Sequence, residues 1–242
     1  MRRRLLALCF LLLLPVVSGC GLIDYYFLPP PEDTAQELFE TGMDYMKEKR
    51  YTRAAESFLR IKDRFPFSPL ATKSEIALGD AYFLNGQYAE AADAYKEYET
   101  LHPASPQIPY VLYQLGQSNM KQFRTIDLRQ DNIKEALEIF YRLEETYPNT
   151  EFSKGTKEKI YECRKILCEH EIFIADFFWR TEQYGAAWHR YLFVLENFGD
   201  VNEFKDYVRK RAEYSYFEYQ KVLSEEEREK VQWTWKRLTK WL

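Results

Sequence analysis

A set of small, aromatic and proline residues that recurs with the same internal spacing limits the fold more than any other feature. In each of the first two copies a glycine is followed by tyrosine, alanine and proline after 3, 12 and 24 residues, and an aromatic residue follows the alanine after 4. The second copy lies 37 residues after the first. The copies are Gly42, Tyr45, Ala54, Phe58 and Pro66, then Gly79, Tyr82, Ala91, Tyr95 and Pro103. A fixed period of this length indicates a protein built from stacked repeats.

Two further copies follow, each with a change. The third has eight extra residues between its glycine and its alanine, around Lys121–Asp131. The fourth begins with alanine in place of glycine and ends with glycine in place of proline. The marker residues are Gly116, Ala136, Phe140 and Pro148, then Ala175, Phe178, Ala187, Tyr191 and Gly199. The pattern is therefore kept through four copies, and a weaker fifth helical pair ends the chain.

The spacing predicts an all-α fold in which each copy is a helical hairpin. Small residues let the two helices approach closely, an aromatic ring fills the space beside them, and proline ends the second helix. One hairpin cannot bury its own apolar face, so the hairpins stack. We predict a tetratricopeptide-repeat solenoid of about five hairpins, at 35–68, 72–105, 109–150, 168–201 and 203–242. Residues 151–180 contain no proline and one glycine, which predicts a single long helix.

The first residues form a separate segment. Three arginines precede an apolar run of 13 residues, Leu5–Val17, which is too short to span a bilayer core of about 30 Å. Ser18 and Gly19 supply the small side chains that a signal peptidase needs before its cut. The string that ends at Cys20 resembles the bacterial lipobox, which implies cleavage between Gly19 and Cys20 and a lipid anchor on Cys20. We expect a signal peptide at 1–19, a lipidated tether at 20–33 and the repeat domain at 34–242.

The composition favours a binding protein over an enzyme. Removal of residues 1–19 removes three of the 34 basic residues and none of the 38 acidic ones. The resulting net charge, about −7, gives no reason to expect nucleic acid. His102, His170 and His189 form no metal-binding pattern, and the sequence has no phosphate-binding loop or nucleophile motif. Cys163 and Cys168 lie about 140° apart on a helix, which favours two buried thiols. We expect no catalytic residue, metal or cofactor.

The first helices of tetratricopeptide hairpins line the concave face of the solenoid. Their residues that face into this concave side are candidates for a peptide groove. In the first three hairpins these positions combine apolar and aromatic side chains with scattered charges. The groove candidates are Phe39, Met43, Met46, Ile76, Asp80, Phe83, Tyr110 and Tyr113. Such a groove suits an extended apolar peptide. Packing between repeats is the alternative role for the same side chains.

The last two hairpins offer candidates for contact with another protein. Trp179 and Arg180 occupy the groove positions at the end of the first helix of the fourth hairpin. Trp233 and Trp241 lie eight residues apart, with Arg237 between them. Exposed tryptophan and arginine are frequent anchors of protein interfaces. The alternative for the C-terminal residues is that they cap the end of the solenoid.

Several strings resemble one known family. They are Arg64-Phe-Pro-Phe-Ser-Pro69, Leu101-His-Pro-Ala-Ser-Pro106, Tyr147-Pro-Asn-Thr150, and Ala175-Asp-Phe-Phe178 followed by Tyr184-Gly-Ala-Ala187 and Arg190. Together with the lipobox and the enlarged third unit, they resemble the BamD family, the lipoproteins of the outer-membrane β-barrel assembly machinery. The resemblance covers nearly the whole mature chain, and Gly199 departs from the family's proline.

The resemblance implies a non-catalytic scaffold, lipid-anchored on the periplasmic face of the outer membrane. Proteins of this family bind the insertase BamA through their later repeats, and their earlier repeats are thought to receive segments of unfolded outer-membrane proteins. Other assembly lipoproteins are further candidate partners. We expect Arg190 to pair with a partner carboxylate, and a solvated surface arginine is the alternative. The competing interpretation is another tetratricopeptide lipoprotein, such as a pilotin for a pilus secretin or a cell-wall coordination factor.

Overall fold

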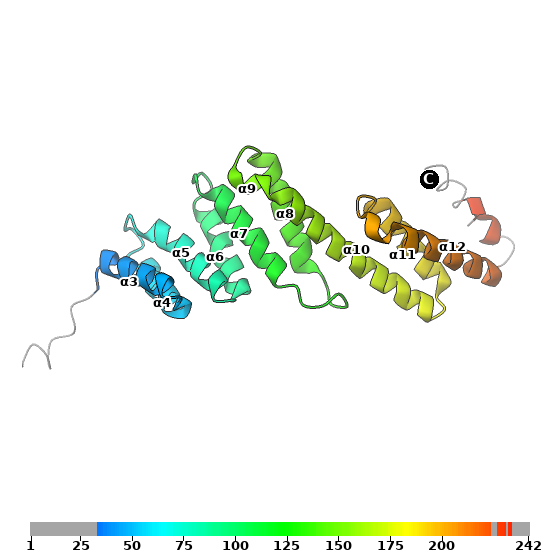
Figure 1. Cartoon of the computed structure of the whole chain (residues 1–242), viewed down its shortest axis with the longest axis horizontal. Coiled ribbons are helices and arrows are strands. Elements are labelled where there is room, and N and C mark those ends of the chain that lie inside the picture. The colour runs from blue at the N-terminus through cyan, green and yellow to red at the C-terminus, as the bar shows by residue number, and fades with distance from the viewer. Residues whose placement is uncertain (1–32, 224–226, 231, 234–242) are drawn as a thin grey trace, which may run out of the picture.

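The structure, a computed structural model, describes residues 33–223, 227–230 and 232–233. Within these ranges the chain is helical and has no strand. The helices form an elongated array with α3 near one end and α12 near the other (Figure 1). They are α3 Ala35–Lys47, α4 Tyr51–Arg64, α5 Ala71–Leu84, α6 Tyr88–Leu101, α7 Ile108–Lys121, α8 Asp131–Thr146, α9 Glu151–Lys154, α10 Thr156–Arg180, α11 Tyr184–Asn197, the 3-10 helix η1 Asn202–Phe204, and α12 Lys205–Val222.

The predicted repeat solenoid is confirmed. Each long helix packs chiefly against the helices that precede and follow it, as expected for stacked hairpins. The hairpins are α3–α4, α5–α6, α7–α8 and α10–α11, and α12 begins a fifth. Among the described residues, no helix combines the length and the apolar character needed to cross a membrane. The signal peptide with its cleavage site at Gly19 and Cys20, the tether up to residue 32, and Arg237 and Trp241 lie outside the described residues.

The marker glycines of the first three hairpins lie directly against an aromatic ring of the second helix. A Cβ atom added to Gly79 would lie 2.6 Å from Cε1 of Tyr95, far inside van der Waals contact. The same 2.6 Å separation occurs in two other hairpins, between Gly42 and Phe58 and between Gly116 and Phe140. All three rings are fully buried. Glycine suits these positions because the ring occupies the space that a side chain would fill.

Three hairpins share one tight turn between their helices. Lys49, Gly86 and Glu182 adopt left-handed backbone angles, with φ of 60°, 77° and 60°. Each is the middle residue of a three-residue connection, at 48–50, 85–87 or 181–183. This conformation lets the following amide bond back to the end of the first helix, as from Gln87 to the carbonyl of Tyr82 at 2.9 Å. The third hairpin replaces this turn with the insertion, residues 122–130.

The predicted single helix over residues 151–180 is wrong at its start. α9 ends at Lys154, and α10 begins after Gly155. The ring of Phe152 packs against Tyr110 on α7, with centroids 5.4 Å apart, and against Tyr113 at 6.1 Å. These contacts hold α9 against α7, whereas α10 packs against α8 and α11. The remaining 25-residue helix still joins the third hairpin to the fourth, as predicted.

Candidate functional site

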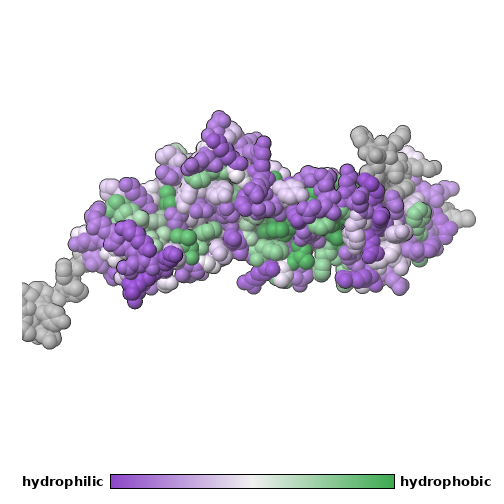
Figure 2. Space-filling view, in the orientation of Figure 1, coloured by the Kyte–Doolittle hydropathy of each residue, from purple (hydrophilic) through white to green (hydrophobic). Residues whose placement is uncertain are grey.

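The eight groove candidates lie on α3, α5 and α7, the first helices of three successive hairpins. Met43 is 38% exposed, and the other seven side chains are half-buried. The ring of Phe39 lies 5.9 Å from that of Phe58, and the ring of Phe83 lies 5.4 Å from that of Tyr88. These side chains therefore pack between helices while part of their surface stays accessible. Figure 2 shows a mainly hydrophilic face on which apolar side chains reach the surface in several separate places.

Asp80 is the carboxylate among these candidates, and two tyrosines bond to it. The hydroxyls of Tyr95 on α6 and Tyr110 on α7 both donate to Oδ1, at 2.6 and 2.5 Å. Burial raises the pKa of Asp80, while the hydrogen bonds from Tyr110 and Tyr95 lower it. No described residue donates to Oδ2 of Asp80. The cluster thus links the second hairpin to the third and leaves one carboxylate oxygen free to accept a hydrogen bond.

The fourth hairpin repeats this arrangement at Asp176. Tyr191 on α11 donates to Oδ1, and Tyr207 on α12 donates to both carboxylate oxygens, at 2.8 and 2.9 Å. The guanidinium of Arg211 donates to the Tyr207 hydroxyl at 3.2 Å and lies 5.3 Å from the ring centroid of Trp179. The sequence interpretation missed both clusters. Their signal was an aspartate directly after the marker residue in the two units whose later aromatic residue is tyrosine.

The proposed partner-interface residues lie at separate places in the second half of the array. Trp179 is half-buried, with its ring 5.1 Å from that of Tyr184, whereas Arg180 is exposed. Arg190 donates to Oε2 of Glu171 on α10 at 2.6 Å. Trp233 is 70% exposed. Arg190, which we expected to meet a partner carboxylate, therefore already has one within its own chain.

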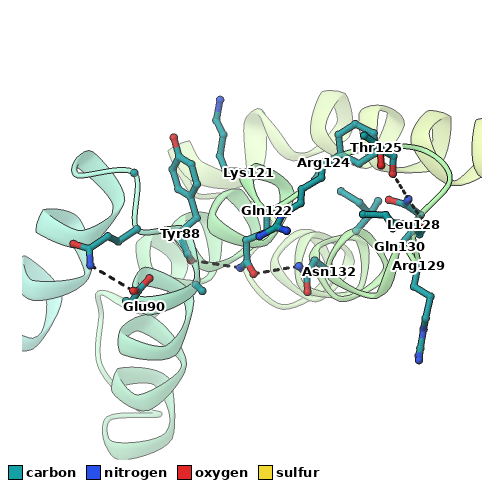
Figure 3. A pocket seen from close by; sticks show the side chains of 15 residues that line it. Tyr88, Glu90, Lys121, Gln122, Arg124, Thr125, Leu128, Arg129, Gln130 and Asn132 are labelled. Atoms are coloured by element: carbon teal, nitrogen blue, oxygen red, sulfur yellow. Dashed lines mark hydrogen bonds between the residues drawn. The ribbon is translucent and has the colours of Figure 1, made fainter.

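A pocket of about 620 Å³ lies where the insertion meets the second hairpin (Figure 3). One wall is formed by residues 86–90, the turn before α6 and its first residues. The other is formed by residues 121–125 and 128–130 and by the start of α8. Its charged lining residues are Lys121, Arg124, Arg129 and Glu90. The sequence showed a charged insertion, but the wall that it faces lies more than 30 residues away in the chain.

Cys163, Cys168, His102 and His170 are placed as structural residues, whereas His189 is exposed. Cys163 and Cys168 are free and buried, and burial raises the pKa of each thiol to about 12, which makes them unreactive. His102 caps the end of α6 and contacts Glu75 through Nε2 at 2.7 Å. His170 contacts the carbonyl of Ile126 in the insertion through Nδ1 at 2.6 Å. In the part of the chain that the structure describes, no three His, Cys, Asp or Glu residues are grouped to hold a metal ion.

Comparison with known proteins places this chain among bacterial envelope proteins. It is 26% identical to the outer membrane protein assembly factor BamD of Caulobacter vibrioides over 181 residues, which are 74% of this chain and 59% of that protein. It is 23% identical to proteins of the same name from Vibrio cholerae and Neisseria meningitidis. Those alignments cover 79% and 92% of this chain and 82% and 85% of the relatives. The chain thus spans less than two thirds of the Caulobacter protein and most of the other two.

The family comparison covers the whole array of repeats. The sequence profile of the family described as YfiO, outer membrane lipoprotein, matches residues 31–232. This range runs from before α3 to beyond α12 and includes every hairpin described above. The chain therefore belongs to the YfiO family of outer membrane lipoproteins.

Proposed function

We propose that this chain is a non-catalytic scaffold that helps to assemble outer membrane proteins. The observation that carries the proposal is the family match over residues 31–232, whose relatives are named outer membrane protein assembly factors. A solenoid offers long surfaces on which several partners can be held at once. The function then depends on which partners its two halves hold and on where the chain is anchored.

In this proposal the earlier repeats receive extended segments of unfolded outer membrane proteins. Phe39, Ile76 and Phe83 are half-buried on α3 and α5 and offer apolar contacts to such a segment. The free Oδ2 of Asp80 offers an acceptor for a backbone N–H of an extended chain. Apolar contacts with a regular backbone acceptor favour many related segments over one fixed sequence.

The later repeats, in this proposal, hold the insertase BamA. Trp179, Arg180, Arg190 and Trp233 supply the contacts, together with Arg237 and Trp241 outside the described residues. The pair of Arg190 and Glu171 supports this role, because the Arg190 side chain is 44% exposed while bonded to Glu171. A partner carboxylate can bind the accessible part of the guanidinium, which has donors on both edges.

The anchor completes the proposal. Lipid on Cys20 holds the scaffold on the periplasmic face of the outer membrane, so that it acts where barrels insert. The lipobox resemblance and the description of the family as outer membrane lipoproteins support this placement. Cys20→Ala is expected to leave the helical fold intact and to release part of the protein from the membrane, as measured by fractionation and circular dichroism.

Photo-crosslinking in living cells tests whether the earlier and later repeats bind different partners. A crosslinking amino acid at Phe39 or Phe83 is expected to capture unfolded outer membrane proteins, and one at Arg190 to capture BamA. Phe67, which is 99% exposed in the loop after α4, serves as the accessible control. Equal capture of both partners at all positions would contradict the division. Failure of BamA to co-purify with the chain from detergent extracts would contradict the scaffold itself.

A further inference from the structure

The pocket beside the insertion is formed by groups that none of the roles above uses. It lies at the turn ends of the second and third hairpins and includes none of the eight groove candidates, although Tyr88 of its lining packs against Phe83. The insertion is present in only one of the four matching repeats. Without it, α7 and α8 would be joined by a turn like those at 85–87 and 181–183, and this wall of the pocket would not exist.

The wall formed by the insertion is held in one shape. Gln130 is 4% exposed, and its amide donates to the carbonyls of Thr125 and Leu128 at 2.9 and 2.6 Å. The amide of Gln122 donates to the carbonyl of Tyr88 at 3.4 Å and accepts from Asn132 at 3.1 Å, which ties the two walls together (Figure 3). Several hydrogen bonds thus shape this loop before any ligand arrives, which lowers the entropy cost of binding.

The lining of the pocket carries an excess of positive charge. Arg129 forms an ion pair with Asp131 at 2.9 Å and points away from the other labelled side chains in Figure 3. Lys121 and Arg124 are exposed, and no carboxylate of a described residue forms an ion pair with either. Glu90 is the acidic residue of the lining, and it accepts a hydrogen bond from Gln87 at 3.4 Å. Two unpaired cations therefore line a pocket in a chain whose net charge is −4.

Apolar groups lie beside these cations. Phe123 is 37% exposed and Leu128 is 49% exposed, and both line the pocket with the half-buried Tyr88. A phosphate site would surround its ligand with cations and backbone amides. Here cations alternate along the loop with apolar side chains, which suits a polypeptide better than a phosphate group. The volume of about 620 Å³ lies within the usual range of ligand-binding clefts.

We propose that this pocket docks an acidic segment of a partner protein, in which carboxylate side chains lie next to apolar ones. Its carboxylates pair with Lys121 and Arg124, and its apolar side chains pack on Phe123 and Leu128. The site adds a third attachment point to the scaffold, between the proposed groove and the later repeats. Because paired charges and buried apolar surface both contribute, binding depends on salt and also on the apolar residues of the segment.

Fluorescence anisotropy with the purified full-length protein tests this proposal. The probe is a labelled synthetic peptide that alternates glutamate with leucine, and the comparison peptide has glutamine in place of every glutamate. The double variant Lys121→Glu/Arg124→Glu is expected to weaken binding of the glutamate peptide about tenfold or more. The matched control, Lys154→Glu/Lys210→Glu, reverses two exposed lysines elsewhere and is expected to change binding by less than about twofold.

Further variants and competitors distinguish a peptide site from a charged patch or a phosphate site. Phe123→Ser/Leu128→Ser is expected to weaken binding while circular dichroism stays unchanged, which a purely electrostatic site would not produce. Equal binding of the two peptides, equal losses in the two charge-reversed variants, or no binding to the unmodified protein would each overturn the proposal. Displacement of the peptide by inorganic phosphate or by phosphatidylglycerol vesicles at constant ionic strength would overturn it in favour of a phosphate site.

Discussion

The second and fourth hairpins differ from the first and third at one pair of positions. Directly after the marker residue, one group has Asp80 and Asp176, and the other has Met43 and Gln117. The buried ring of the second helix is tyrosine in the first group and phenylalanine in the second: Tyr95 and Tyr191 against Phe58 and Phe140. A buried hydroxyl and a buried carboxylate each need a hydrogen-bond partner, so aspartate and tyrosine occur together.

One repeat can thus carry two kinds of contact without a change in its backbone. In the first three hairpins the ring lies at the same distance from the marker glycine, whether it is phenylalanine or tyrosine. In the hairpins with aspartate, a further tyrosine of the next hairpin, Tyr110 or Tyr207, bonds to the same carboxylate. The polar pair therefore also links neighbouring hairpins, which the apolar pair does not do at this position.

The greatest loss of stability is expected when the acceptor is removed. Asp80→Ala leaves the hydroxyl of Tyr95 buried without a partner and removes the acceptor of the Tyr110 hydroxyl. We therefore expect the free energy of unfolding to fall by about 2–3 kcal/mol. The matched change Gln117→Ala in the third hairpin removes no such acceptor and is expected to cost less than about 1 kcal/mol. Urea denaturation followed by circular dichroism measures both. Similar losses in the two variants would show that the acceptor role of Asp80 adds nothing to stability.

The next effect tests the shared space beside the marker residue. Gly79→Ala places a methyl group 2.6 Å from the ring of Tyr95, and this overpacking is expected to cost about 1–2 kcal/mol despite the better helix propensity of alanine. The fourth hairpin already has Ala175 there, fully buried. Ala175→Gly should therefore also destabilise, by about 1 kcal/mol. Stabilisation by Gly79→Ala in thermal denaturation would contradict the close contact.

A rebuilt pair tests whether the aspartate and the tyrosine act together. Asp80→Met/Tyr95→Phe copies the pair of the first hairpin, Met43 with Phe58, into the second. We expect this double variant to be more stable than Asp80→Met alone by about 1 kcal/mol, because Tyr95→Phe removes the unpaired hydroxyl. The double-mutant cycle is completed by Tyr95→Phe. Purely additive losses would mean that the two residues are not coupled.

A dependence on pH is the weakest of these effects. Burial raises the pKa of Asp80, so the part of the stability that depends on its protonation is present below the unfolded value of about 4 and is lost as pH rises through the raised folded value. The melting temperature of the wild type relative to Asp80→Asn should therefore fall as pH rises above about 4. Glu37 serves as a contrast of opposite sign. Hydrogen bonds from Thr34 lower its pKa, so its contribution is lost as pH falls.

Local rules predicted most of the fold. Three helices end two residues before a proline, at Pro66, Pro103 and Pro148, because proline cannot continue a helix. α3 begins at the predicted capping box, in which Thr34 and Glu37 bond to each other's backbone amides. The break at Gly155 was missed because glycine alone does not end a helix. It depends on the packing of Phe152 against α7, a contact between residues about 40 positions apart.

The candidate sites divide in the same way. The sequence placed the eight groove candidates on the first helices of three hairpins, where the structure has them, since a period of helical hairpins assigns each residue to a helix. It could not show that Arg190 meets Glu171, because that pair joins two helices across the fourth hairpin. Nor could it show that Tyr110 shares Asp80 with Tyr95, although all three residues stand in the pattern.

The amino-acid sequence alone sets the number and order of the hairpins, the positions that suit glycine, and the family to which the chain belongs. These follow from spacing along the chain, because the same spacing recurs in each repeat. The packing of the folded chain decides which carboxylates and hydroxyls pair, where α9 leaves the line of α10, and that the insertion forms a pocket with Gly86–Glu90. Those features depend on the distances between side chains of neighbouring hairpins, which the repeat period does not set.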